Sequence, residues 1–116
     1  MARLAFILVV VASIVGCSAP DPTGKLPAMH GQSREQVVSQ LGRPQRADEF
    51  PMSRAIGEFR IELQNTYPLG NPTNADVRIE ELTWRDGDHW ITLWLHQVKG
   101  QWVVLESCRW HKDVVF

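Results

Sequence analysis

Residues 77–111 read VRIEELTWRDGDHWITLWLHQVKGQWVVLESCRWH, and this stretch decides the fold. It is rich in β-branched and aromatic residues, and two short polar pairs, Asp86-Gly87 and Lys99-Gly100, interrupt it. Asp-Gly between two such runs is a strong signal for a β-hairpin, and Lys-Gly allows a second tight turn. We therefore expect strands over 77–85, 90–98 and 101–111, each antiparallel to the next.

A further strand is predicted upstream of these three. Phe59, Ile61 and Leu63 alternate with polar residues, and a period of two is typical of a half-buried strand. The segment 68–76 contains Pro, Gly and Asn and is expected to be a loop, whereas 45–57 mixes charged, small and Pro residues and is expected to be irregular. The four predicted strands follow one another as a meander.

A short helix is predicted over 34–41. Ser33 is a favourable N-cap, and Gln36, three residues later, completes a capping box. Gly42 can adopt the left-handed conformation that ends a helix. The apolar residues Val37 and Leu41 lie on one side and should bury against the sheet. The fold class is therefore α+β, with a short N-terminal helix packed on one face of a four-stranded antiparallel meander sheet.

The tryptophans are concentrated in the last three strands. They are Trp84, Trp90, Trp94, Trp102 and Trp110. If Val98 pairs with Gln101 across the second turn, one face carries Trp90, Trp94 and Arg109, and the other carries Ile91, Leu93 and Leu95. We expect the helix on the second of these faces, leaving the Trp90 face less covered. The alternative is that this face is core, covered by residues 45–57. The register across Asp86-Gly87 leaves the face of Trp84 open.

The region 30–44 also carries a family resemblance. The pattern Gly-x-Ser-x-x-x-Val-x-x-x-Leu-Gly-x-Pro resembles the recurring helix of the small protein A / outer membrane lipoprotein A family, which shares the architecture of β-lactamase-inhibitor-protein-like domains. The matching residues are Gly31, Ser33, Val37, Leu41, Gly42 and Pro44. The resemblance implies a helix followed by a three- or four-stranded sheet. The family includes a subunit of the outer-membrane β-barrel assembly machinery, so the resemblance also implies an envelope role.

The N-terminus predicts a bacterial lipoprotein precursor. Arg3 precedes an apolar run of about a dozen residues, which is typical of an export signal and too short to span a bilayer. Ile14-Val15-Gly16-Cys17 resembles a lipobox. We expect a signal peptide over 1–16, a lipidated flexible tether over 17–28 with lipid on Cys17, and one domain over 29–116. Ser18 favours the outer membrane facing the periplasm, although the inner membrane stays open.

Charge and composition argue against several classes of function. The chain has a net charge of −1, and cleavage of the signal removes Arg3 and leaves about −2, so nothing favours nucleic acid as a partner. Cys108 and His111 fall on opposite faces of a strand, which argues against a catalytic pair. His89 and His96 could join them around a metal, but no two of these four residues have the spacing of a preorganised site. We therefore expect no catalytic residues, no metal and no cofactor.

Two hypotheses for function remain. The first is a non-catalytic envelope lipoprotein that binds another envelope protein through Trp90, Trp94 and Arg109. Outer-membrane assembly or maintenance is the process that this hypothesis names for it. The second is a periplasmic small-ligand binder with a Trp-lined site on the sheet. A broad aromatic face would favour the first hypothesis, and a closed pocket with convergent polar groups would favour the second. The oligomeric state, and whether Cys108 is buried or bridges two chains, stay open.

Overall fold

The structure, a computed structural model, describes residues 29–116. The predicted signal peptide, Cys17 and the tether lie outside the described residues. Within 29–116, no helix is long and apolar enough to cross a membrane.

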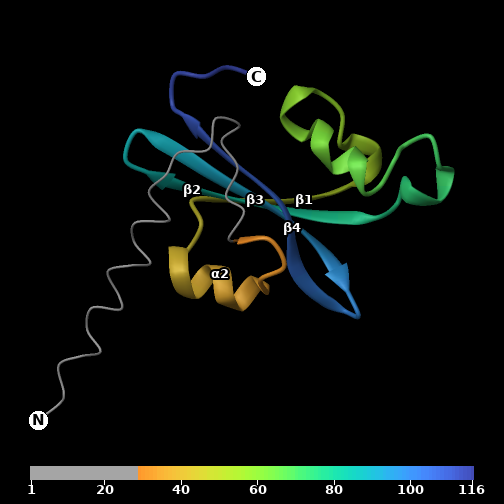
Figure 1. Cartoon of the computed structure of the whole chain (residues 1–116), viewed down its shortest axis with the longest axis horizontal. Helices are drawn as coiled ribbons and strands as arrows, with labels where there is room; N and C mark the ends of the chain where they lie inside the picture. The colour runs from red at the N-terminus through yellow and green to blue at the C-terminus, as the bar shows by residue number, and fades with distance from the viewer. Residues whose placement is uncertain (1–28) are drawn as a thin grey trace, which may run out of the picture.

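The centre of the fold is one antiparallel sheet with the strand order β1-β2-β3-β4 (Figure 1). The strands are β1 (Arg46–Pro51), β2 (Arg78–Asp86), β3 (His89–Val98) and β4 (Gln101–His111). The α+β class and the four antiparallel strands are therefore confirmed. The last three strands begin and end within a residue or so of their predicted bounds.

Both predicted hairpins form with two-residue loops. Asp86 pairs with His89, so the first loop consists of Gly87 and Asp88. In the second hairpin, Val98 pairs with Gln101, as expected. Lys99 and Gly100 form this loop with φ values of 53° and 80°. Positive φ at both central residues is what the twist of a tight hairpin favours, although it is uncommon for a residue other than glycine.

The first strand was predicted in the wrong place. Residues 58–65 form the 3-10 helix η4 (Glu58–Asn65), and β1 lies in the segment expected to be irregular. Side chains three residues apart share one side of a 3-10 helix, and here Arg60, which donates to Glu81 of β2, and the buried Leu63 both face the sheet. Leu63 is buried while Ile61 is 48% exposed, which fits the helical form. In β1 only Phe50 is fully buried, so this edge strand carries almost no apolar pattern.

The helix α2 (Arg34–Leu41) lies on one side of the sheet (Figure 1). The Ser33 side chain accepts from the Gln36 amide, and the Gln36 side chain accepts from the Ser33 amide, so the capping box is complete. Val37 is fully buried against the sheet, and Leu41 is only partly buried. Before the helix, Gly31 donates to the carbonyl of Val104 at 2.9 Å, which ties the chain to β4.

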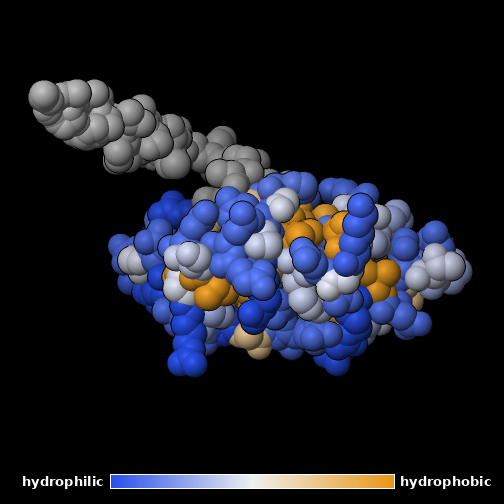
Figure 2. Space-filling model, turned by 90° about the horizontal axis from the view of Figure 1, so that it is seen from below, coloured by the Kyte–Doolittle hydropathy of each residue, from blue (hydrophilic) through white to orange (hydrophobic). Residues whose placement is uncertain are grey.

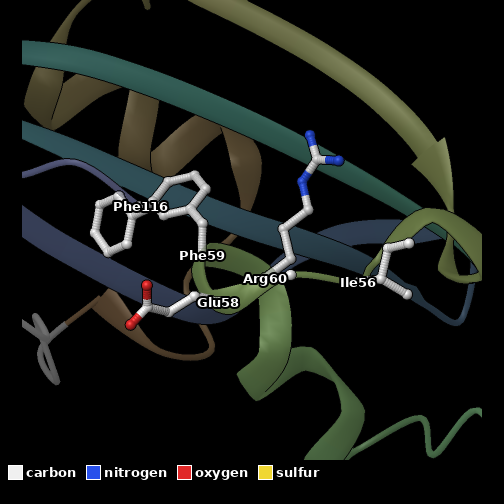
Figure 3. A pocket seen from close by; sticks show the side chains of 6 residues that line it. Ile56, Glu58, Phe59, Arg60 and Phe116 are labelled. Atoms are coloured by element: carbon white, nitrogen blue, oxygen red, sulfur yellow. The ribbon is translucent and has the colours of Figure 1, made fainter.

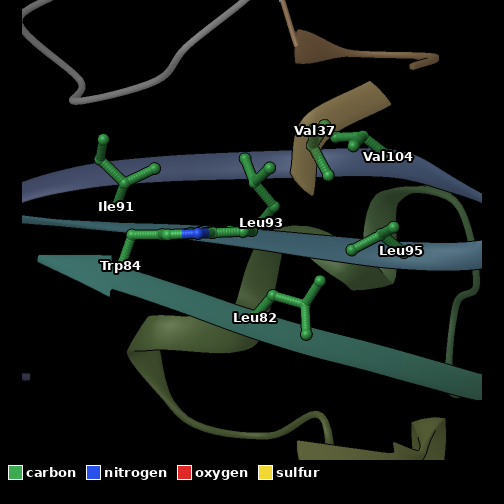
Figure 4. Close-up of a cluster of buried hydrophobic side chains, with 7 residues drawn as sticks. All are labelled: Val37, Leu82, Trp84, Ile91, Leu93, Leu95 and Val104. Carbon is green, nitrogen blue, oxygen red and sulfur yellow. The ribbon is translucent and has the colours of Figure 1, made fainter. Parts of the chain in front are cut away.

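We call the side of the sheet under α2 the helix face. Val37 packs there in a core cluster that Figure 4 shows, together with Leu82, Trp84, Ile91, Leu93, Leu95 and Val104. The helix thus covers the predicted face, and Trp84 joins it because Trp84 pairs with Ile91. Seen from the side of α2, apolar residues show as separate small areas among hydrophilic ones (Figure 2).

The opposite side, which we call the second face, is covered by the segment that connects β1 to β2 (Figure 1). This segment contains three short 3-10 helices, η3 (Met52–Arg54), η4 and η5 (Pro72–Asn74). A second core cluster forms beneath it from Phe50, Met52, Ala55, Leu63, Ile79, Trp94 and Leu105. Trp94 is only 3% exposed. The prediction that this face is the less covered one is therefore wrong at Trp94.

A β-bulge changes the side-chain alternation in β4. Trp94 pairs with Glu106 and Leu95 with Val104, so Leu105 is the extra residue. A shift of one residue moves every later side chain to the other face. Cys108 and Trp110 therefore join the second face, whereas Arg109 pairs with Ile91 and lies on the helix face. The expectation that Arg109 lies beside Trp90 and Trp94 is wrong for this reason.

Candidate functional site

A pair of partly exposed tryptophans lies on the second face, at the end of the sheet near the β2–β3 hairpin. Trp90 on β3 and Trp110 on β4 are direct cross-strand partners. Their rings stack with centroids 6.5 Å apart and an angle of 25° between the planes. Both side chains are only partly buried, in contrast to Trp94, four residues after Trp90 on β3. The pair forms a rigid aromatic surface that remains in contact with solvent.

Two arginines lie over the ring of Trp90. The guanidinium carbon of Arg46 is 4.7 Å from the ring centroid, and that of Arg85 is 4.9 Å away. Such cation–π contacts contribute about 0.5–1 kcal/mol each at exposed sites. Arg85 also donates from Nε to the carbonyl of Gly87 at 2.6 Å, which fixes its side chain at the hairpin. We call Trp90, Trp110, Arg46 and Arg85 the tryptophan–arginine surface.

The chain just before β1 holds one side of this surface in place. The Gln45 amide donates to the carbonyl of Thr83, and the Gln45 side chain accepts from the amide of Arg85. The indole Nε1 of Trp84 donates to the carbonyl of Gly42 at 2.8 Å. The two bonds of Gln45 extend the pairing of β1 with β2 beyond Arg46. They keep the backbone of Arg46 beside that of Thr83.

Aromatic rings continue from Trp110 toward η4. Phe59 contacts Trp110 edge-on with centroids 5.0 Å apart, and it contacts Trp94 at the same distance. Phe116 lies 4.8 Å from Phe59 and is 51% exposed. Together with Ile56, Glu58 and Arg60, these two phenylalanines line a shallow, open hollow (Figure 3). The hollow does not enclose a small molecule, since one broad side faces solvent.

A partly buried ion pair connects η4 to the sheet beside Trp94. Arg60 donates from Nε and Nη2 to the two carboxylate oxygens of Glu81, each at 2.9 Å. Trp94 Nε1 donates to the same carboxylate at 2.6 Å, and the Arg60 guanidinium lies 3.9 Å above the ring of Phe50. The hydrogen bond to Glu81 raises the pKa of Arg60 above its ordinary value. Each member has a partner within the fold, so this group holds the structure together.

The histidines and the cysteine do not assemble into a site. Within 29–116, no group of three His, Cys, Asp or Glu side chains lies close enough to hold a metal ion. His96 contacts the hydroxyl of Tyr67 at 2.6 Å, and burial lowers the pKa of His96. The rings of His89 and His111 meet edge-on at 5.3 Å. Cys108 is partly buried against the core cluster of the second face and forms no disulfide in the structure.

The three predicted partner-binding residues lie in different environments. Only Trp90 lies on the partly exposed surface, whereas Trp94 is buried and Arg109 lies on the helix face, 3.4 Å from Asp86. Sequence reasoning missed Arg46, Arg85 and Trp110. The alternation of side chains in β2 could have placed Arg85 on this face. The face of Trp110 is set by the bulge in β4, which the sequence does not indicate. Arg46 lies in β1, a strand without a recognisable apolar pattern.

The chain matches no protein-family model, no curated protein and no solved structure. The resemblance of residues 30–44 to the small protein A / outer membrane lipoprotein A family therefore stays a prediction.

Proposed function

We propose that this chain is a non-catalytic, lipid-anchored protein of the bacterial cell envelope that binds another envelope protein through its tryptophan–arginine surface. The observation that carries the proposal is the environment of Trp90. Its ring stacks on Trp110, lies under Arg46 and Arg85, and remains partly exposed. Tryptophan and arginine are the residue types that most often dominate binding energy at protein interfaces.

The form of the surface favours a protein over a small ligand. Small-molecule sites are usually concave and bury most of the ligand. The hollow beside Phe59 and Phe116 is open, and the tryptophan–arginine surface lies at a partly exposed end of the second face. A rigid, partly exposed aromatic surface can instead bury its remaining area against a second protein at little cost in side-chain entropy.

The remaining parts of the proposal concern location. The lipobox at Ile14–Cys17 supports lipidation of Cys17, with the domain held by its tether at the outer membrane, facing the periplasm. In this arrangement the short N-terminal helix α2 packs on the helix face and leaves the tryptophan–arginine surface available. Mass spectrometry of the N-terminal peptide tests the anchor, because any mature N-terminus other than a lipid-modified Cys17 contradicts it.

Site-specific photo-crosslinking in cells tests the binding function. We would replace Phe116 by p-benzoylphenylalanine, because its ring lies 5.7 Å from Trp110 and is half exposed. The matched control carries the same group at Val98, which is 43% exposed at the far hairpin. We expect a discrete protein adduct from position 116 that is lost when Trp90→Ala is added. Equal adducts from both positions, or an adduct that ignores Trp90→Ala, would contradict the proposal.

A further inference from the structure

The arginines of the sheet and its covering segments fall into two groups. Arg34, Arg60, Arg78 and Arg109 each lie within 4.0 Å of a carboxylate, at distances from 2.9 to 3.4 Å. Arg46, Arg54 and Arg85 differ, since none has a carboxylate within that distance among residues 29–116, and neither does Arg43 just before β1. Of these unpaired arginines, Arg46 and Arg85 lie over the same ring, that of Trp90.

These two positive charges share one aromatic neighbour. Both guanidinium groups lie within 5 Å of the centroid of the same indole ring. The ring attracts each cation, but the two cations repel each other. An anion placed between them would interact favourably with both. A carboxylate is a suitable anion, because a guanidinium can bind its two oxygens with paired hydrogen bonds.

We propose that the tryptophan–arginine surface recognises an acidic segment of the partner protein. One or two carboxylates of that segment contact Arg46 and Arg85, and the methylene groups of the same side chains pack against the part of Trp90 and Trp110 that remains exposed. This inference rests on the proposed function and adds the chemistry of the partner. It also assigns distinct roles, since the arginines supply charge recognition and the Trp90–Trp110 stack supplies apolar contact.

The charge of the chain favours an acidic protein segment over an anionic lipid surface. Recognition of anionic lipids typically uses clusters of four to eight Lys or Arg residues. Here the pair beside Trp90 is small, and the whole chain has a net charge of −1, so a membrane surface would attract it weakly. Two neighbouring arginines on an aromatic ring match the few, closely placed charges of a peptide.

Nuclear magnetic resonance titration of the full chain, purified from membranes in a non-ionic detergent, tests the proposal. The probe is a capped hexaglutamate peptide, and the signals are the indole N–H of Trp90 and the Nε–H of Arg46 and Arg85. We expect saturable shifts of these signals and none with capped hexaglutamine. The double variant Arg46→Gln/Arg85→Gln should weaken binding by roughly tenfold or more, since each charged hydrogen bond contributes substantially.

Two further variants make the result specific. Arg78→Gln removes a similarly exposed arginine that is already paired with Glu49, so it should leave the affinity unchanged. Arg46→Lys/Arg85→Lys retains the charges and should retain part of the binding, even if the glutamine variant were to fold poorly. Shifts spread over all exposed basic residues, or an equal loss with Arg78→Gln, would overturn the proposal.

A comparison of probes distinguishes failure of acidic recognition from failure of the proposed protein binding. If phosphatidylglycerol vesicles, and not hexaglutamate, perturb Trp90, the ligand is a lipid surface and the inference is wrong. If hexaglutamate fails while the Trp90-dependent adduct from position 116 persists, the surface binds a protein without acidic recognition. If hexaglutamate binds but no such adduct forms, the proposed function fails while the anion preference of the surface stands.

Discussion

Trp90 and Trp94 offer a matched test of which part of the second face is core and which part is surface. They lie four residues apart on β3 and point to the same face, so they differ mainly in what covers them. Trp94 is 3% exposed, contacts Phe59 and donates to Glu81, whereas Trp90 is only partly buried. Replacing each by alanine should therefore produce very different losses of stability.

The expected loss for Trp94→Ala follows from its burial. Truncation of a buried tryptophan costs about 3–5 kcal/mol, mainly because it leaves a cavity. Since a domain of this size has a total stability of about 5–15 kcal/mol, this is a large fraction. It corresponds to a fall in Tm of more than about 12 °C, at roughly 4–8 °C per kcal/mol for a domain of up to 100 residues.

The expected loss for Trp90→Ala is smaller. The variant loses the stack with Trp110, worth about 0.5–1.5 kcal/mol, and two cation–π contacts of about 0.5–1 kcal/mol each. Part of the ring stays in solvent in the native state, so less apolar area is lost. The losses are not additive in full, and we expect roughly 1–3 kcal/mol in total.

Urea unfolding followed by circular dichroism measures both variants against the parent chain. Trp94→Phe serves as a milder companion that keeps an aromatic ring, removes the hydrogen bond to Glu81 and should cost about 1–3 kcal/mol. A Trp90→Ala variant as unstable as Trp94→Ala would show that Trp90 is core. The tryptophan–arginine surface would then lose its basis. A cost below about 1 kcal/mol for Trp94→Ala would refute the packing argument itself.

Two further predictions concern the helix and the pH dependence. Val37 is fully buried and Leu41 only partly, so Val37→Ala should cost about 1–3 kcal/mol, at least as much as the larger truncation Leu41→Ala, and urea unfolding of both variants checks this order. Burial, with a smaller contribution from His30, lowers the pKa of His96 below 6.5, so the unfolded chain binds a proton that the folded chain does not. Stability should therefore fall as the pH drops below that value. The fall should be smaller in His96→Gln, and an unchanged pH dependence would argue against the shift.

The sequence was most informative where side-chain periodicity and turn residues agreed. The strands β2, β3 and β4 carry β-branched and aromatic residues between Asp86-Gly87 and Lys99-Gly100, and both hairpins form. The segment 45–65 was misassigned because its signals are weak or ambiguous. Phe59, Ile61 and Leu63 alternate as in a strand, whereas Arg60 and Leu63, three residues apart, fit one side of a 3-10 helix. β1 is an edge strand whose register is set by pairing with β2 and whose only fully buried side chain is Phe50.

The bulge at Leu105 shows why the candidate site could be predicted only in part. The residues 101–111 contain no glycine that would indicate an irregularity, so an unbroken alternation was the natural expectation. In the structure, Leu105 packs in the core with Trp94, and the one-residue shift turns Trp110 toward Trp90. Without the bulge, Arg109 would face Trp90 and Trp110 would lie on the helix face. The bulge that the sequence does not predict therefore brings Trp110 against Trp90. It also turns Arg109 to the helix face, so Arg46 and Arg85 are the arginines that contact the Trp90 ring.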